Sequence, residues 1–210
     1  MKRTKNPAKE AEYRKRAADL VAQMTLHEKV SQMLSWAPAI ERLGIPAYNW
    51  WSEGIHGIGR AGTATVFPQA IGMAAAFDED MMEQVGNAVG VEARGKYNMC
   101  RAHGDRDIFK GLTVWAPNIN IFRDPRWGRG HETYGEDPFL TSRLGVRFVE
   151  GMQGDDPDYL QAAACAKHFA VHSGPESDRH HFNAIVSKQD LWETYLPAFR
   201  ALVKEAGVEA

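Results

Sequence analysis

The fold is decided by residues 112–152, which read LTVWAPNINIFRDPRWGRGHETYGEDPFLTSRLGVRFVEGM. Leu112–Ala116 is a short apolar run with β-branched residues, and it predicts a buried strand. Phe139–Met152 repeats its large apolar residues at helical spacing, which predicts a helix with one buried face. A long polar loop, Pro117–Pro138, joins the two. A strand followed by a helix is the repeating unit of α/β proteins.

The same alternation continues on both sides of this segment. Three further runs predict strands: Ile45–Trp50, Ala64–Phe67 and Ala163–Val171. These runs are largely apolar and do not alternate, which is typical of parallel strands that are buried on both faces. Helices are predicted around them, over Ala8–Ala22, from Thr25 through Leu34, from Asp78 to about Tyr97, and from Ser187 through Val203. The sequence therefore predicts an α/β fold with about four parallel strands.

The N-terminal segment is set apart from this pattern. Residues 1–24 predict a helical lead-in, and Thr25 with Glu28 forms a capping box that opens the next helix. Because there is no internal repeat and no low-complexity linker, we interpret residues 1–210 as a single domain. Gly207–Ala210 is typical of a turn that enters another strand, so we expect this domain to be incomplete.

Composition excludes several classes of protein. Hydrophobic residues make up 44% of the 210 residues and charged residues 25%, as in ordinary globular proteins. The formal net charge of −2 recommends neither nucleic acid nor an anionic membrane as a partner. Cys100 and Cys165 are too few for a disulfide framework, and no signal peptide is visible. We therefore expect a cytoplasmic protein.

Polar side chains gather directly after three of the predicted strands. They lie in the segments Tyr48–His56, Arg123–Asp137 and Lys167–Arg179. In a parallel α/β protein the C-terminal ends of the strands meet on one face, where ligands bind. Sugar hydroxyl groups need paired donors and acceptors, and the C–H faces of a sugar pack on aromatic rings. The three segments therefore predict a sugar-binding pocket.

Two competing motifs are not supported by their surroundings. Gly57–Gly62 matches the dinucleotide pattern G-x-G-x-x-G, but a β-branched stretch closed by Pro68 follows it where a helix is required. His168 and His172 would pair as metal ligands only on a helix, and no third ligand stands at metal-site spacing. We therefore predict no cofactor and no metal.

At this point the residues resemble glycoside hydrolase family 3. The resemblance runs from about Met24 to Ala210, and its motifs occur in the family's order. They are Phe67–Gln69, Glu92–Arg94, the loop Arg126–Pro138 and the Lys-His-Phe triplet Lys167–Phe169. The resemblance implies a TIM-like (β/α)₈ barrel, of which this chain would form about the first four to five βα units. It also implies hydrolysis with retention of configuration.

The resemblance places the family's sugar-binding positions on four residues, Glu53, Arg129, Lys167 and His168. Glu132 is expected to orient Arg129 or Lys167, and His56 and Trp51 are supporting candidates. Lysine and arginine donate to several hydroxyl groups, and a carboxylate accepts from two. The alternative is a network of internal salt bridges that binds no ligand. Trp51, like Trp50, could also be a core residue.

Neither catalytic carboxyl group is expected among these residues. A retaining glycosidase needs a nucleophile and a general acid/base roughly 5 Å apart. The family's nucleophile is an aspartate several strands after Lys-His-Phe, and Ser177-Asp178-Arg179 follows Lys167 too closely. The prediction is a truncated enzyme, inactive alone, whose partners are a carbohydrate and the missing C-terminal part. A non-catalytic sugar-binding or structural remnant is the alternative of another class.

Glu53 suggests which sugar the parent enzyme hydrolyses. The stretch Tyr48–Gly57 resembles the xylosidase branch of the family, whereas the glucosidase branch usually has aspartate at the position of Glu53. The longer glutamate would reach the space that a glucose hydroxymethyl group occupies, and xylose has only hydrogens there. The predicted function is exo-hydrolysis of terminal β-xylosyl residues from xylo-oligosaccharides, and the alternative is a β-glucosidase in which Glu53 bends away.

Overall fold

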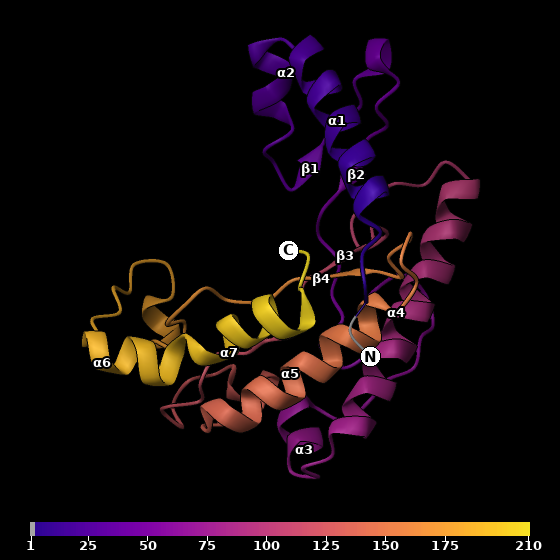
Figure 1. Ribbon diagram of the computed structural model, residues 1–210. Helices are drawn as coiled ribbons and strands as arrows, with labels where there is room; N and C mark the ends of the chain where they lie inside the picture. Colours follow the sequence, from indigo (N-terminus) through magenta and orange to yellow (C-terminus); the bar gives the residue numbers. More distant parts are fainter. Residues whose placement is uncertain (1–2) are drawn as a thin grey trace.

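A computed structural model describes residues 3–210 and is mostly helical (Figure 1). Its helices are α1 Pro7–Gln23, α2 Leu26–Ser31, α3 Ala70–Ala74, α4 Glu79–Ala102, α5 Pro138–Gln153, α6 Lys188–Asp190 and α7 Pro197–Ala201. Short 3₁₀ turns occur at Glu41–Leu43, Gly130–Glu132 and Glu176–Asp178, and π-helical turns at Leu191–Tyr195 and Leu202–Ala206. The strands are β1 Trp36–Ala37, β2 Tyr48–Asn49, β3 Thr113–Val114 and β4 Ala163–Ala164.

The predicted helix starts are confirmed, since each depends on a local capping contact. Asp78 and Asp137 accept hydrogen bonds from backbone N–H groups in the first turns of α4 and α5, and Ser187 does so for α6. Both halves of the capping box between Thr25 and Glu28 are present. The helix predicted from Ser187 through Val203 is interrupted at Pro197, where α7 begins after a π-helical turn.

Within the described residues, the parallel strands are shorter and fewer than predicted. β3 and β4 pair in parallel, as expected, but Ile45–Trp50 contains only β2, which pairs antiparallel with β1. Ala64–Phe67 is extended without a ladder partner; instead, Phe67 N–H bonds His56 O and Thr65 N–H bonds the Glu92 carboxylate. The strand prediction was wrong for Ala64–Phe67 because a short apolar run does not determine which backbone pairs with it, and Val66 is 77% exposed.

Parallel pairing nevertheless extends beyond the named strands. Ser52 forms a parallel bridge with Val114, and Asn118 forms one with Lys167. Ala210 donates its backbone N–H to Ala164 O and accepts from Ala166 N–H, both at 3.1 Å, so the last residues lie beside β4. The chain thus forms part of a TIM-like α/β barrel, as predicted. Its parallel segments are joined by one short ladder and by isolated bridges.

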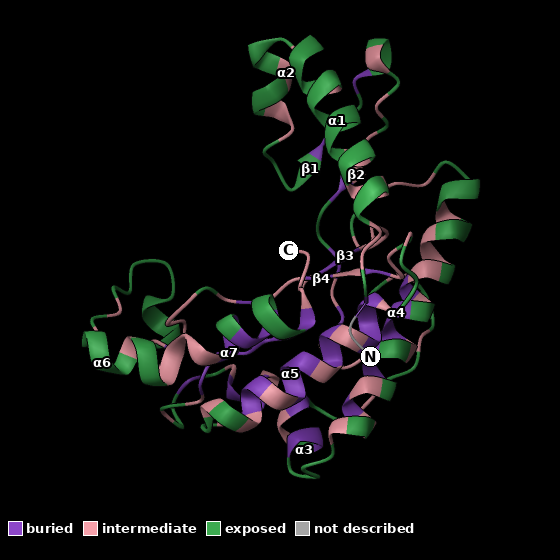
Figure 2. Cartoon of the chain, in the orientation of Figure 1, coloured by how far each residue is buried: buried purple, intermediate pink, exposed green. Residues whose placement is uncertain are grey.

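The main core lies between α4, α5 and the central strands (Figure 2). Met82 and Val89 of α4 and Leu144 and Phe148 of α5 are fully buried, and the two α5 residues lie in the stretch whose spacing predicted one buried face. Gly86 permits close approach of the two helices, since a Cβ atom there would overlap the backbone of Phe148. The helix pair therefore supports one side of the β3–β4 ladder.

The helical lead-in forms an arm with α2, β1 and β2, at the top of Figure 1. α1 contains no buried residue, and most of the arm is exposed in Figure 2. Its first turn is tied to the body by Lys9, whose ammonium group is 2.7 Å from the Asp158 carboxylate. Across the described residues, no helix combines the length and the apolar character that crossing a membrane requires.

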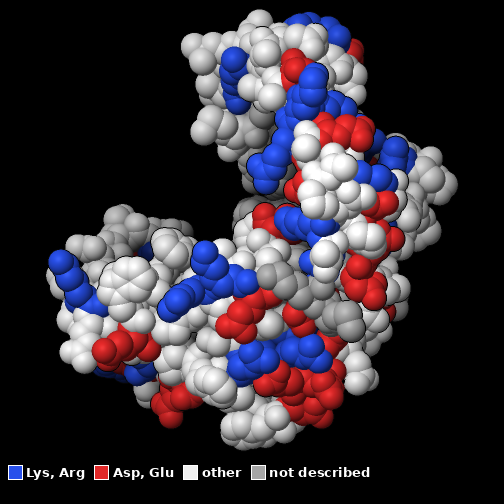
Figure 3. All heavy atoms as spheres, viewed as in Figure 1, with Lys and Arg blue, Asp and Glu red and all other residues white. Residues whose placement is uncertain are grey.

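Charges are interspersed over the face shown in Figure 3. On the body, Arg143 pairs with Glu79 and Glu205, and Arg147 pairs with Asp80 and Glu150. Exposed pairs of this kind contribute little to stability. They tie α4, α5 and the C-terminal helix to one another without producing a surface patch of one sign.

Candidate functional site

Backbone pairing brings Glu53 and Lys167 to the same edge of the barrel. Trp115 donates its N–H to Ser52 O at 2.8 Å, and Ile119 donates to Lys167 O at 2.9 Å. Glu53 directly follows Ser52, which bridges Val114, and Lys167 bridges Asn118, so the two side chains come from parallel segments that both pair with residues 114–118. This is the arrangement that the polar clusters after the strands predicted.

Glu53 and Lys167 form an ion pair at the site. The Lys167 Nζ atom is 3.6 Å from Glu53 Oε2, and the side chains are 10% and 33% exposed, respectively. Burial lowers the pKa of Lys167, while the carboxylates of Glu53 and Glu132 oppose this effect. A buried ammonium group between two carboxylates retains donors for a ligand, because at 3.6 Å the pair is an electrostatic contact and not a tight hydrogen bond.

Arg129 and Glu132 form a second, bidentate pair. Arg129 Nε lies 2.7 Å from Glu132 Oε1, and Nη2 lies 2.6 Å from Oε2. Burial raises the pKa of Glu132, but hydrogen bonds from Arg129 and the charges of Arg129 and Lys167 outweigh burial and lower the pKa below its usual value. Glu132 is therefore ionised and orients Arg129, one of the two residues that it was expected to orient.

His168 is held in one tautomer by Asn120. The Asn120 Nδ2 atom donates to the backbone carbonyls of His168 and Ala170, at 2.8 and 2.9 Å, which fixes the amide orientation. Asn120 Oδ1 therefore accepts from His168 Nδ1 at 3.0 Å, and His168 Nε2 faces Arg129 Nη1 at 3.3 Å. Burial, together with the charges of Arg129 and Lys167, lowers the pKa of His168 to about 3. The imidazole is neutral at physiological pH.

This lowered pKa predicts a pH dependence of stability. The pKa of His168 is about 3 in the folded protein, against an ordinary value of 6.5, so the unfolded chain binds more protons between these values. The stability that neutral His168 contributes is complete above about pH 6.5 and is lost as the pH falls toward about 3. His168→Asn should therefore show a smaller loss of melting temperature between about pH 7 and about pH 4.5 than wild type.

Exposed His180 supplies the matched control for this experiment. His180→Asn should reproduce the wild-type loss of melting temperature. Equal losses in wild type and His168→Asn would show that the His168 imidazole does not resist protonation.

A cavity of about 220 Å³ opens beside the two carboxylates. Glu53, His56, Gln69, His131 and Glu132 contribute polar side chains to its wall. The His56 Nδ1 atom donates to Phe67 O at 3.0 Å, which orients the ring at the wall. The cavity is large enough for a monosaccharide-sized ligand and is lined by donors and acceptors.

Trp51 lies beside this cavity and contacts Glu53. Its indole Nε1 donates to Glu53 Oε1 at 2.8 Å. Its ring stacks on Trp115, with ring centroids 4.8 Å apart and an interplanar angle of 15°. Trp51 is 38% exposed, so it is not a core residue, which was the alternative from the sequence.

All seven candidates from the sequence thus gather at one rim of the barrel. Sequence reasoning missed Asn118, Asn120, Trp115 and His131. The two asparagines follow β3 after Trp115, Ala116 and Pro117, and their position in the segment after a strand was the available signal. They were overlooked because an asparagine in a loop is usually a turn residue.

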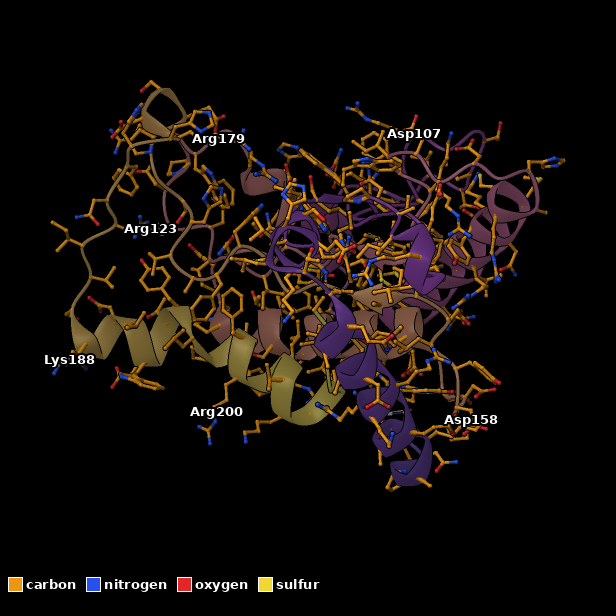
Figure 4. All side chains as sticks on the ribbon, turned by 90° about the horizontal axis from the view of Figure 1, so that it is seen from above. Asp107, Arg123, Asp158, Arg179, Lys188 and Arg200 are labelled. Atoms are coloured by element: carbon orange, nitrogen blue, oxygen red, sulfur yellow. The ribbon has the colours of Figure 1, made fainter. Side chains whose placement is uncertain are left out.

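A second hollow lies next to this rim. It has a volume of about 530 Å³ and is lined by Arg123, Trp127 and Glu176, among others. In Figure 4, Arg123 and Arg179 lie at the same end of the molecule, away from Asp107. Within residues 3–210, no group of three or more His, Cys, Asp or Glu side chains is placed to hold a metal ion.

Comparison with known protein families shows to which family this chain belongs. The family model described as "Glycosyl hydrolase family 3 N terminal domain" matches residues 17–210. The chain belongs to glycosyl hydrolase family 3. The family 3 resemblance of the Arg126–Pro138 loop and the Lys-His-Phe triplet is thereby confirmed.

Its relatives within family 3 include several proteins named as xylosidases. The chain is 52% identical over 199 residues to a xylan 1,4-beta-xylosidase of Xylanibacter ruminicola, covering 93% of this chain and 23% of the relative. It is 44% identical over 209 residues to beta-D-xylosidase 3 of Arabidopsis thaliana, covering 92% and 26%, respectively. The chain thus spans about a quarter of the length of these relatives.

Solved structures of family 3 enzymes show the same fold. A GH3 exo-beta-xylosidase, XlnD, in complex with a xylobiose aziridine activity-based probe, aligns with a TM-score of 0.80 and 35% identity, over 92% of this chain and 26% of its own. Beta-glucosidase 3B of Thermotoga neapolitana, in complex with α-D-glucose, aligns with a TM-score of 0.74 and 28% identity, over 91% and 28%. Both sugar specificities therefore occur among the structural neighbours.

Proposed function

We propose that this chain is the sugar-recognising part of a retaining, exo-acting β-glycosidase that releases terminal β-xylosyl residues from xylo-oligosaccharides. The observation that carries the proposal is the Glu53 carboxylate at the cavity wall, between Trp51 and Lys167. The relatives named as xylosidases support the same activity. A cytoplasmic location stays a prediction.

The proposed binding mode uses donors and acceptors that are already oriented. Glu53 accepts from two sugar hydroxyl groups, and Lys167 Nζ and Arg129 Nη1 donate to others. Neutral His168 stays hydrogen-bonded to Asn120 and limits the positions that Arg129 can take. Because the ion pairs hold these groups before the sugar enters, little side-chain entropy is lost on binding.

The catalytic step requires groups outside this set. Glu132 is bound on both oxygens by Arg129 and has a lowered pKa, so it cannot serve as a general acid. We therefore assign the nucleophile and the acid/base to the part of the enzyme that extends beyond this quarter of the relatives' length. That part of the same enzyme is the proposed partner of this chain.

The preference for xylose rests on the length of Glu53. Its carboxylate stands in the space that a glucose hydroxymethyl group would need, whereas xylose carries only hydrogens there. Glucose would have to displace the carboxylate from Trp51 or leave it without its hydrogen bonds. A site whose polar groups are left unpaired by the wrong sugar discriminates between two sugars more strongly than a site that only loses apolar contact.

Kinetics of the full-length enzyme test this preference. Wild type should show a higher kcat/KM on nitrophenyl β-xyloside than on nitrophenyl β-glucoside, and Glu53→Asp should shift this ratio toward the glucoside by at least about tenfold. Glu41→Asp, an exposed substitution in the arm, is the control and should leave the ratio unchanged. A wild type that prefers the glucoside would support the β-glucosidase alternative, which the structural neighbours also represent.

A further inference from the structure

We propose that Trp51 is a positioning residue for the Glu53 carboxylate, and that its indole N–H, supported by Trp115, sets how strongly the enzyme prefers a pentopyranoside over a hexopyranoside. This inference rests on the proposed function, because it concerns the same selection at Glu53. Trp51 would act without touching the hydroxymethyl group that distinguishes glucose from xylose.

The two oxygens of Glu53 are held in different ways. Oε1 accepts the Trp51 indole hydrogen bond at 2.8 Å, which is close and directional. Oε2 is 3.6 Å from Lys167 Nζ, which is attraction between charges without a fixed direction. The plane of the carboxylate is therefore determined by Trp51, and Lys167 determines only which side it faces.

Trp51 is itself held from three directions. Its backbone N–H donates to Asn49 Oδ1 at 2.9 Å, and its carbonyl accepts from Phe109 N–H at 2.8 Å. Its ring stacks on that of Trp115, and the backbone N–H of Trp115 donates to Ser52 O at 2.8 Å. Trp51 is thus fixed through both its backbone and its ring. Such fixing is what a residue that orients a binding group needs.

Trp50 provides a natural contrast to Trp51. It is also exposed, at 45%, and it packs edge-on against Tyr48 with ring centroids 4.8 Å apart. In the described structure no hydrogen bond joins Trp50 to Glu53, whereas Trp51 makes one. The two neighbouring tryptophans share residue type and exposure, and they differ in their contact with the carboxylate.

Loss of the indole donor should free Glu53 to rotate. With Lys167 as the remaining partner, the carboxylate can follow the ammonium group and leave the space that a hydroxymethyl group needs. The glucoside should then gain activity relative to the xyloside, while the charge at the site is unchanged. The effect should appear in the ratio of kcat/KM values more than in either value alone.

The test uses Trp51→Phe in the full-length enzyme, which keeps an aromatic ring on Trp115 and removes the N–H donor. The xyloside-to-glucoside ratio of kcat/KM should fall by about tenfold, and Trp50→Phe should change it by less than about twofold. Trp51→Leu, which removes both the donor and the stack, should lose at least as much. Melting temperatures of the Phe variants should stay close to that of wild type, because both tryptophans are exposed.

A double-mutant cycle separates positioning from a general structural effect. In the Glu53→Asp background, Trp51→Phe should leave the ratio nearly unchanged, because the shorter carboxylate no longer reaches the indole. An unchanged ratio in Trp51→Phe, or an equal change in both backgrounds, would overturn the inference. The wild-type ratio tests the proposed function and the change on Trp51→Phe tests the inference, so the failure of one is distinguishable from the failure of the other.

Discussion

Replacing Lys167 with methionine in the full-length enzyme should lower kcat/KM on nitrophenyl β-xyloside by about 100- to 1,000-fold. Removing one partner of a buried charged pair costs about 2–5 kcal/mol, and about 1.4 kcal/mol corresponds to a factor of ten. Lys167 is 10% exposed and 3.6 Å from Glu53, so its charge is not replaced by solvent. Both the donor to the sugar and the counter-charge of the carboxylates would be lost.

Lys110→Met is the matched control for this substitution. Lys110 also pairs with a carboxylate, that of Asp105 at 2.5 Å, but it lies outside the site and is more exposed. Its replacement should change kcat/KM by less than about twofold, because an exposed pair contributes little. A threefold or smaller loss in a folded Lys167→Met enzyme would show that the ammonium group is structural and does not bind the sugar.

The 210-residue chain alone should release no nitrophenol from aryl β-xylosides or β-glucosides above the uncatalysed rate. General acid–base catalysis alone is worth about 100- to 10,000-fold, and a retaining mechanism also requires a nucleophile. At the cavity, Glu132 is ionised and bidentate to Arg129, and Glu53 is held by Trp51 and Lys167. Glu132 is therefore not available as a proton donor.

The assay of the purified chain needs two comparisons. The full-length enzyme supplies the positive control, and Glu132→Gln of the short chain tests whether any residual turnover depends on this carboxylate. Turnover above the uncatalysed rate that Glu132→Gln abolishes would place a catalyst inside these residues. Binding of xylose without turnover, measured by calorimetry, would instead agree with the non-catalytic, sugar-binding alternative.

The sequence predicted residues that the structure brings together, and it predicted too regular a barrel. Lys167, Arg129 and Glu53 were found because each follows a strand-like run in a polar cluster, and the structure brings all three to one rim. Ala64–Phe67 was wrongly predicted as a strand. Ala64 and Phe67 pack on the core and Val66 is exposed, while the backbone bonds a loop carbonyl and the Glu92 carboxylate.

By itself the sequence determined the helix starts and the types of residue available at the site. Asp78, Asp137 and Ser187 each cap a helix through an N–H within the following three residues, so no distant contact is needed to predict them. The ordering of strand, polar loop and helix in residues 112–152 is likewise a local property of composition and period.

Only the tertiary structure decided the partners of these residues. Asn120 meets His168, and Glu53 meets Lys167, across long stretches of sequence. The parallel pairing of β3 with β4 and the bridges Ser52–Val114 and Asn118–Lys167 bring these stretches together. Side chains alternate along a strand, so a shift of register by one residue would turn the opposite set of side chains toward the rim. The register follows from the packing of α4, α5 and the strands as a whole, which no local pattern encodes.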